Sequence, residues 1–194
     1  MSIPVVDLWQ FTQGSDSERK NFVYELGRAY EDVGFVAVKN HGIPAELIDE
    51  LYRYVQEFFS LPLAIKKQYE KPALAGQRGY TSFGKEHAKG SEAADLKEFY
   101  QYGQTVEDED PVAAEYPDNV VVNEVAQLTP TLFRVYRHFE KTGKQMLKAI
   151  ALYLGLPADY FDPFITNGNS ILRAIHYPPI TQEPASAIRA EQHE

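Results

Sequence analysis

The segment "SILRAIHYPP", Ser170–Pro179, decides the fold class of this chain. It is rich in apolar and β-branched residues, and its two terminal prolines cannot continue a sheet, which is typical of a strand with a sharp end. A second strand begins in "SAIRAEQH", residues 186–193. Since helical patterns dominate the chain before residue 170, the sequence predicts an α+β protein whose β-structure is only opening at Glu194.

Upstream of that segment, short strands are expected at Ile3–Leu8, Phe35–Asn40 and Lys97–Gly103. Apolar periodicity predicts helices after a capping box at Ser15–Glu18, after Pro44, and through Leu128, Leu132, Phe139, Met146 and Ile150. A polar, glycine-rich loop is expected at Gly76–Gly90. We therefore divide the chain into a helix and strand region, 1–120, and a region of one long helix followed by opening strands, 121–194.

Composition excludes several classes of function. The formal net charge of -9 disfavours a nucleic-acid partner, because phosphates would be repelled. The chain has no cysteine, so disulfides, thiolate catalysis and thiolate metal sites are excluded. The N-terminus does not resemble a signal peptide, and no apolar run is long enough to span a membrane. A cytoplasmic protein without membrane contact is the expectation.

Histidine and carboxylate side chains are the remaining candidates for metal binding. His41 is expected in a turn or capping role, and His138 at the surface of the long helix. His193 differs because an extended strand places it on one face with Arg189 and Glu191. Non-haem Fe(II) oxygenases bind iron with two histidines and one carboxylate, and a His-x-acid pair on a strand provides two of these ligands. The acid of such a pair would follow Glu194, so this chain contains at most one ligand.

Several segments together resemble one known family. They are "IPVVDL" at 3–8, "GFVAVKNHGIP" at 34–44, "FFSLP" at 58–62, "RGYTSFGKE" at 78–86 with "DLKEFYQYG" at 95–103, "LGLPADYF" at 154–161, "LRAIHYPPI" at 172–180 and "RAEQHE" at 189–194. These segments occur in the order found in the isopenicillin N synthase-like family of Fe(II)/2-oxoglutarate-dependent oxygenases. The chain is therefore similar to this family over its whole length.

The resemblance implies a jelly-roll core, or double-stranded β-helix, with N-terminal helices packed around it. It implies that His193 is an iron ligand, and that Tyr177 contacts substrate or co-substrate. Period two along a strand puts Arg173, Ile175 and Tyr177 on one face, so Arg173 is a second candidate for orienting an anion. The implied cofactors are Fe(II) and 2-oxoglutarate, with molecular oxygen and a small organic molecule as the other reactants. No catalytic residue is assigned.

Three other hypotheses remain open at this stage. Isopenicillin N synthase itself uses no 2-oxoglutarate, so the parent protein is alternatively an Fe(II) oxidase of that type. The chain is alternatively a catalytically inert helical module for binding or interaction, because the second half of the metal site is missing. A cupin-like jelly-roll with another metal, or with none, is the third alternative.

Overall fold

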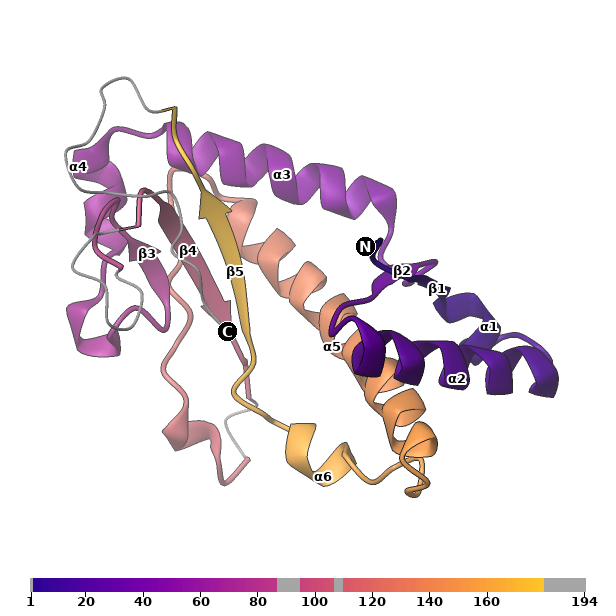
Figure 1. Cartoon of the computed structure of the whole chain (residues 1–194). Helices are drawn as coiled ribbons and strands as arrows, with labels where there is room; N and C mark the ends of the chain where they lie inside the picture. Colours follow the sequence, from indigo (N-terminus) through magenta and orange to yellow (C-terminus); the bar gives the residue numbers. More distant parts are fainter. Residues whose placement is uncertain (1, 87–94, 107–109, 180–194) are drawn as a thin grey trace. The chain divides into compact units, whose positions relative to one another are not determined.

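The computed structural model describes residues 2–86, 95–106 and 110–179. The backbone divides into two compact units, each built from two separate stretches of chain. Unit 1 comprises Met1–Ile48 and Arg137–Gly168, and unit 2 comprises Asp49–Tyr136 and Asn169–Glu194. Both units combine helices with strands (Figure 1), which confirms the predicted α+β class. The proposed regions 1–120 and 121–194 describe the organisation of the family and stay a prediction.

Unit 1 contains a two-stranded parallel sheet. Strand β1 (Val5–Asp7) pairs with β2 (Ala37–Lys39), with Val6 opposite Val38. Helices α1 (Leu8–Thr12) and α2 (Asp16–Asp32) and the second half of α5 (Leu128–Tyr153) belong to the same unit. The side chains that these elements bury together are Val6, Leu8, Phe11, Phe22, Leu26 and Ala149. The two strands predicted in this part of the chain are confirmed over their central residues.

Helix α2 begins and ends where the sequence predicts. The Ser15 hydroxyl accepts the Glu18 N–H at 3.4 Å, and the Glu18 carboxylate accepts the Ser15 N–H at 2.8 Å, so the predicted capping box is confirmed. Both bonds satisfy N–H groups that have no partner inside the helix. At the other end, Gly34 adopts the left-handed backbone conformation, with φ 79°, that commonly terminates a helix.

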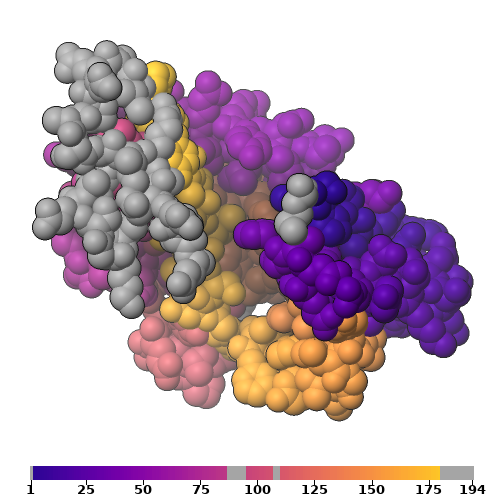
Figure 2. Space-filling model, in the orientation of Figure 1, coloured from indigo at the N-terminus to yellow at the C-terminus, as the bar shows by residue number. Residues whose placement is uncertain are grey.

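Unit 2 is organised around a three-stranded antiparallel sheet in the order β3-β4-β5. Its strands are β3 (Gly79–Thr81), β4 (Glu98–Gly103) and β5 (Ile171–His176). All six residues of the central strand β4 are buried, whereas residues of β5 alternate between exposed and half-buried. The space-filling view accordingly shows part of β5, in yellow, at the molecular surface (Figure 2).

Aromatic rings fill the core beneath this sheet. The Phe58 ring lies in edge contact with the rings of Tyr100, Tyr80 and Tyr69, at centroid distances of 5.1, 5.7 and 6.1 Å. Such pairs add about 0.5–1.5 kcal/mol each to the burial of apolar area. Leu128 and Leu132 from the start of α5 close the same cluster. Part of the rich supply of tyrosine and phenylalanine in the sequence is therefore used in packing.

The remaining helices connect these elements. Helix α3 (Ala45–Ser60) follows Pro44, as predicted, and both α3 and α5 contribute residues to each unit. The shorter helices are α4 (Leu63–Lys66), α6 (Asp162–Ile165), and the 3₁₀ turns η1 (Lys67–Tyr69), η2 (Pro72–Leu74) and η3 (Ala113–Glu115). Within the described residues, no helix is both long enough and apolar enough to cross a membrane.

The expected loop at Gly76–Gly90 is wrong in part, because it contains strand β3. Tyr80 of this strand is fully buried and lies opposite Tyr100 of β4. Three residues are too few to show an alternating pattern. The first residue of the strand must be a glycine, because the φ of Gly79 is 78° and an added Cβ would lie 2.5 Å from the Tyr69 carbonyl oxygen. The strand expected at 186–193 lies outside the described residues.

Candidate functional site

Arg173 on β5 is the predicted site residue whose position is best defined by its contacts. Antiparallel pairing puts it opposite Gln101 of β4, and its Nε donates to Gln101 Oε1 at 2.7 Å. Its Nη1 donates to the Glu86 carboxylate at 3.0 Å, and the guanidinium lies 4.2 Å from the centre of the Phe99 ring. Arg173 Nη2 donates to none of the described residues, whereas Nε and Nη1 are both engaged.

Arg173 lines a pocket of about 320 Å³ in unit 2. The wall combines an aromatic and a small apolar part with a larger polar and charged part: Phe99, Tyr80, Pro72, Ala75, Gly76, Thr81, Gln101, Glu70, Lys71, Lys85 and Glu86. The volume is in the range of sites for small molecules, and the charged lining favours a polar or ionic ligand. Gln101 is itself held in place, because its Nε2 donates to the Gly76 carbonyl.

A row of alternating charges anchors Arg173 at this pocket. Asp95 pairs with Lys97 at 2.8 Å, Lys97 with Glu86 at 2.6 Å, and Glu86 with Arg173. Burial by itself raises the pKa of the Glu86 carboxyl, but the hydrogen bond from Lys97 and the charge of Arg173 outweigh it and lower that pKa. Glu86 therefore stays ionised at neutral pH and keeps the guanidinium in a fixed orientation.

A buried network centred on Glu98 lies on the same strand β4. The Glu98 carboxylate accepts two hydrogen bonds from Lys66 Nζ, at 2.8 and 2.9 Å, and one from the Tyr80 hydroxyl. His176 Nδ1 lies 2.8 Å from the same carboxylate, and the His176 ring stacks on Phe59 at 5.1 Å. Burial by itself raises the pKa of Glu98, but these donors outweigh it and lower that pKa. An ionised Glu98 therefore orients His176 with the proton on Nδ1.

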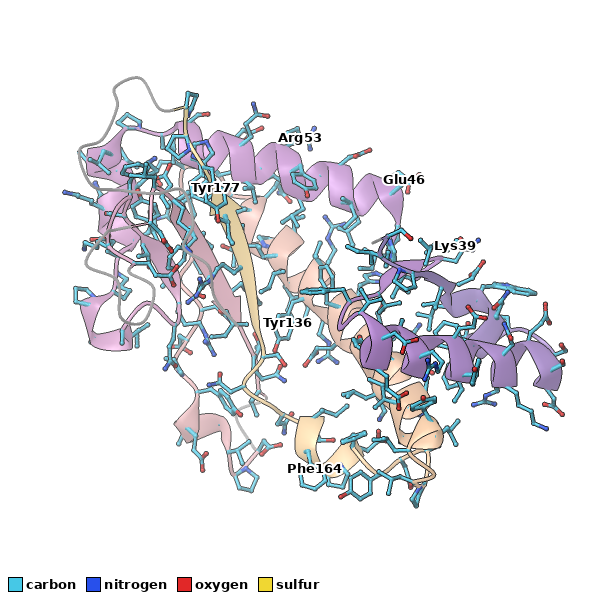
Figure 3. The ribbon with its side chains drawn as sticks, viewed as in Figure 1. Lys39, Glu46, Arg53, Tyr136, Phe164 and Tyr177 are labelled. Atoms are coloured by element: carbon cyan, nitrogen blue, oxygen red, sulfur yellow. The ribbon has the colours of Figure 1, made fainter. Side chains whose placement is uncertain are left out.

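Tyr177, the other predicted contact residue, directly follows β5 (Figure 3) and is 40% exposed. Its hydroxyl makes no hydrogen bond with the described residues. The 320 Å³ pocket is lined by Arg173 and not by Tyr177, so the two predicted residues do not share this pocket.

His193, the predicted iron ligand, lies outside the described residues. Within the part of the chain that the structure describes, no group of three or more His, Cys, Asp or Glu side chains could hold a metal ion. His176 and His41 both have fixed hydrogen-bond partners there, at Glu98 and at the Ile43 N–H. The turn role expected for His41 is thus confirmed.

Sequence reasoning missed the residues that hold these side chains in place. Glu98 and Gln101 were visible as polar residues in a predicted strand that is otherwise aromatic. Their partners were not visible, since Lys66 is 32 residues from Glu98 and Arg173 is 72 residues from Gln101. The unusual polar positions within an aromatic strand were the available signal.

Unit 2 of this α+β chain thus presents a pocket beside its sheet, with the guanidinium of Arg173 fixed at the wall. A family model described as the N-terminal part of non-haem dioxygenases in morphine synthesis matches residues 3–124, more than half of the chain. The chain belongs to this family. The resemblance to the isopenicillin N synthase-like Fe(II)/2-oxoglutarate-dependent oxygenases is thereby confirmed.

Two curated relatives illustrate the match. The 1-aminocyclopropane-1-carboxylate oxidase of Dictyostelium mucoroides is 30% identical over 91% of this chain and 49% of its own length. The 2-oxoglutarate-dependent dioxygenase htyE of Aspergillus rugulosus is 31% identical over 98% of this chain and 59% of its own length. The chain therefore spans between about half and three fifths of these relatives.

Solved structures give the same result at the level of the fold. A 2OG-Fe(II) oxygenase family protein from Caulobacter crescentus is 34% identical, with a TM-score of 0.83 over 95% of this chain and 59% of that one. A full-length Neurospora crassa protein in complex with alpha-KG is 25% identical, with a TM-score of 0.81 over 98% of this chain and 60% of that one. Further structures of this Neurospora crassa protein contain thymine or 5-formyluracil, so that neighbour binds small molecules.

Proposed function

We propose that the whole protein is a non-haem Fe(II), 2-oxoglutarate-dependent oxygenase that hydroxylates, desaturates or cyclises a small organic molecule. The observation that carries the proposal is Arg173, whose guanidinium lines a pocket and is fixed by Gln101 and Glu86, while its Nη2 donates to none of the described residues. A guanidinium with an unused N–H donor suits a carboxylate, which both 2-oxoglutarate and many small substrates carry. Family membership and the relatives named above support the reaction class.

The proposal includes the finer structural expectations. Strand β5 is the opening of the jelly-roll core, regions 1–120 and 121–194 are the helical part and the start of that core, and His193 is the first iron ligand. The other ligands would come from residues after Glu194. Bound Fe(II) would supply the activation of molecular oxygen, which protein side chains do not provide.

The residues of this chain would then bind and orient the organic reactants. Arg173 would hold an anionic group of substrate or co-substrate, and Phe99 would provide an apolar surface beside it. Because Glu86 remains ionised, the guanidinium keeps its orientation whether or not a ligand is present. Tyr177 would contact the ligand from the end of β5.

The experiment compares His193→Ala, Arg173→Ala and Arg53→Ala in the whole protein. Anaerobic calorimetry measures binding of Fe(II) and then of 2-oxoglutarate or substrate. His193→Ala is expected to weaken Fe(II) binding at least ~10-fold, since it removes a direct ligand. Arg173→Ala is expected to leave Fe(II) binding unchanged and to weaken one organic ligand ~10-fold or more, because a charge-assisted pair is lost.

Arg53→Ala is the matched control, since it removes an equal charge from the exposed face of α3 (Figure 3) and should change neither measurement. Wild-type iron affinity in His193→Ala would refute the ligand assignment. Unchanged binding of every organic ligand in Arg173→Ala would refute the role of Arg173.

A second candidate is an Fe(II) oxidase that consumes oxygen without 2-oxoglutarate. The relative named 1-aminocyclopropane-1-carboxylate oxidase favours keeping it. Oxygen uptake with iron, substrate and ascorbate distinguishes the two, since the first candidate requires added 2-oxoglutarate and the second does not.

A further inference from the structure

A second pocket lies wholly within unit 1, whereas Arg173 and Glu98 belong to unit 2. It has a volume of about 380 Å³. The end of α1, the start of α2, the turn after β2 and the second half of α5 all contribute to its wall. None of the residues used for the proposed oxygenase site lines it, so any ligand it binds would be additional to substrate and co-substrate.

The charge of this pocket is opposite to that of the protein. Arg19, Lys141, His41 and His138 line it, and no carboxylate does. The chain as a whole has a formal net charge of -9, so a wall with two permanent cations and two imidazoles stands out. A concave site lined by one sign of charge concentrates ligands of the opposite sign.

Both permanent cations lack an anionic partner among the described residues. The Arg19 guanidinium lies 4.7 Å from the centre of the Phe11 ring, and this stacking leaves its N–H groups without an acceptor. Lys141 makes no ion pair with a described carboxylate. The buried cations Lys66 and Lys97, by contrast, are paired with Glu or Asp.

His41 adds a hydrogen-bond donor in a fixed orientation. Its Nδ1 accepts the Ile43 N–H at 3.2 Å, so the ring proton resides on Nε2. The turn itself is held by the Thr142 hydroxyl, which donates to the His41 carbonyl at 2.8 Å. The left-handed backbone of Asn40 and Gly42, with φ of 52° and 78°, allows this tight turn.

Two carboxylates, Asp7 and Glu18, are linked to lining residues of this pocket and hydrogen-bond to neutral groups. Asp7 accepts two hydrogen bonds from the Asn40 amide, both at 2.9 Å, and one from the Trp9 N–H at 3.1 Å. Glu18, which precedes Arg19, is bound to Ser15 in the capping box. Neither carboxylate forms an ion pair with Arg19 or Lys141.

We propose that this pocket binds a phosphate monoester with a compact apolar body. Arg19, Lys141 and the His41 Nε2–H would bind the dianionic phosphate, for which two cations and a neutral donor are a suitable set. The buried side chains of Leu8 and Phe11, which also line the pocket, would contact the apolar body.

The test is calorimetric titration of the whole protein with phenyl phosphate at constant ionic strength. Saturable one-to-one binding is expected. The variant Arg19→Gln/Lys141→Gln is expected to bind at least ~10-fold more weakly, since two charge-assisted contacts are lost. The matched control Lys20→Gln/Lys148→Gln removes the same charge from α2 and α5 outside the pocket, and should bind within about twofold of wild type.

Thermal unfolding of each variant verifies that it is folded, which is expected because Arg19, Lys20 and Lys141 are exposed. Absence of saturable binding by the wild type would overturn the proposal. Equal loss in both double variants would also overturn it, since only the net charge would then matter. Tighter binding of benzoate than of phenyl phosphate would exclude phosphate as the recognised group.

Discussion

At the scale of single residues, Glu98 shows how this protein keeps a charge in its interior. Glu98 and Lys66 are 4% and 7% exposed, so both have lost nearly all contact with water. Removing an ion from water costs several kcal/mol, which only good geometry and additional hydrogen bonds can offset. The Phe59 carbonyl accepts a further hydrogen bond from Lys66, and Tyr80 and His176 make further hydrogen bonds with Glu98.

We expect Glu98→Gln to lower the free energy of unfolding by about 3–5 kcal/mol, because it leaves the buried Lys66 ammonium without a counterion. Lys66→Met is expected to cost a similar amount. The double variant should cost clearly less than the sum, since neither charge is then left alone. Urea denaturation at neutral pH measures all three values.

The control for this cycle is the exposed pair of Arg28 and Asp32, which are 45% and 54% exposed and 2.7 Å apart. Arg28→Ala should leave the urea midpoint close to that of the wild type, because water and salt screen an ion pair at the surface. If the costs of Lys66→Met and Glu98→Gln simply add, the two side chains do not interact as described.

Arg78 is a second buried charged side chain, and unlike Glu98 it has no counterion among the described residues. Its side chain is fully buried, its Nη1 donates to the Gln77 carbonyl at 2.9 Å, and its Nε and Nη2 have no partner among the described residues. Burial lowers the pKa of Arg78, because it disfavours the charged form. An added Cβ at Gly103 would lie 1.9 Å from the centre of the guanidinium, which explains the glycine at the end of β4.

At the scale of elements, the sequence predicts the long helices α2 and α5 better than the short elements β3 and α1. The capping box at Ser15–Glu18 and the apolar period from Leu128 to Ile150 act locally, so α2 and α5 were readable. Strand β3 was not, because it exists through pairing with β4 and has only three residues. Helix α1 was not predicted for a similar reason, since five residues are too few to show the apolar periodicity of a helix.

Helix packing in unit 1 gives a prediction from two glycines. An added Cβ at Gly27 of α2 would lie 2.2 Å from the Tyr153 ring, whereas one at Gly143 of α5 would meet nothing within 4 Å. Gly27→Ala should lower the free energy of unfolding by about 1–3 kcal/mol through overpacking. Gly143→Ala should raise it by about 0.5–1 kcal/mol, because alanine is the better helix former.

Denaturation curves of the two variants, measured side by side, check this pair. Adding Tyr153→Leu to Gly27→Ala should recover part of the loss, because the smaller side chain leaves room for the methyl group. A stabilising effect of Gly27→Ala would contradict the close approach of α2 to Tyr153.

At the scale of the whole molecule, the sequence could not predict how the chain is divided. Each unit joins stretches far apart in the chain, as when Asn169–Glu194 returns to the unit that contains Asp49–Tyr136. Arg173 was identified on its strand, but the pocket beside it depends on Gln101 and Glu86, which are 72 and 87 residues away. Local patterns hold no information about such pairing, which explains why the site residues were predicted more readily than the site.

The response of the protein to acid depends on many groups together. Five carboxyls have a pKa that is clearly lowered from its ordinary value: Asp7, Glu18, Glu70, Glu86 and Glu98. The folded state therefore binds fewer protons than the unfolded state at acidic pH. The stability that these groups contribute is fully present above their unfolded pKa values, 3.8 for Asp and 4.5 for Glu.

We expect the free energy of unfolding to fall steadily once the pH drops below about 4.5, as these carboxylates take up protons on their way to the lower folded pKa values. Glu98 should contribute most, because it is the most buried of them and has the most donors, whereas Asp7 and Glu18 at the surface should contribute little. Urea denaturation between pH 7 and pH 3 measures how steeply the free energy of unfolding falls with pH.

The double variant Lys66→Met/Glu98→Gln should lose less stability over this range than the wild type. The exposed control Glu46→Gln, on α3 (Figure 3), should follow the wild type. If the double variant loses as much stability as the wild type, the ionised Glu98 network does not control the acid response, and the surface carboxylates must account for it.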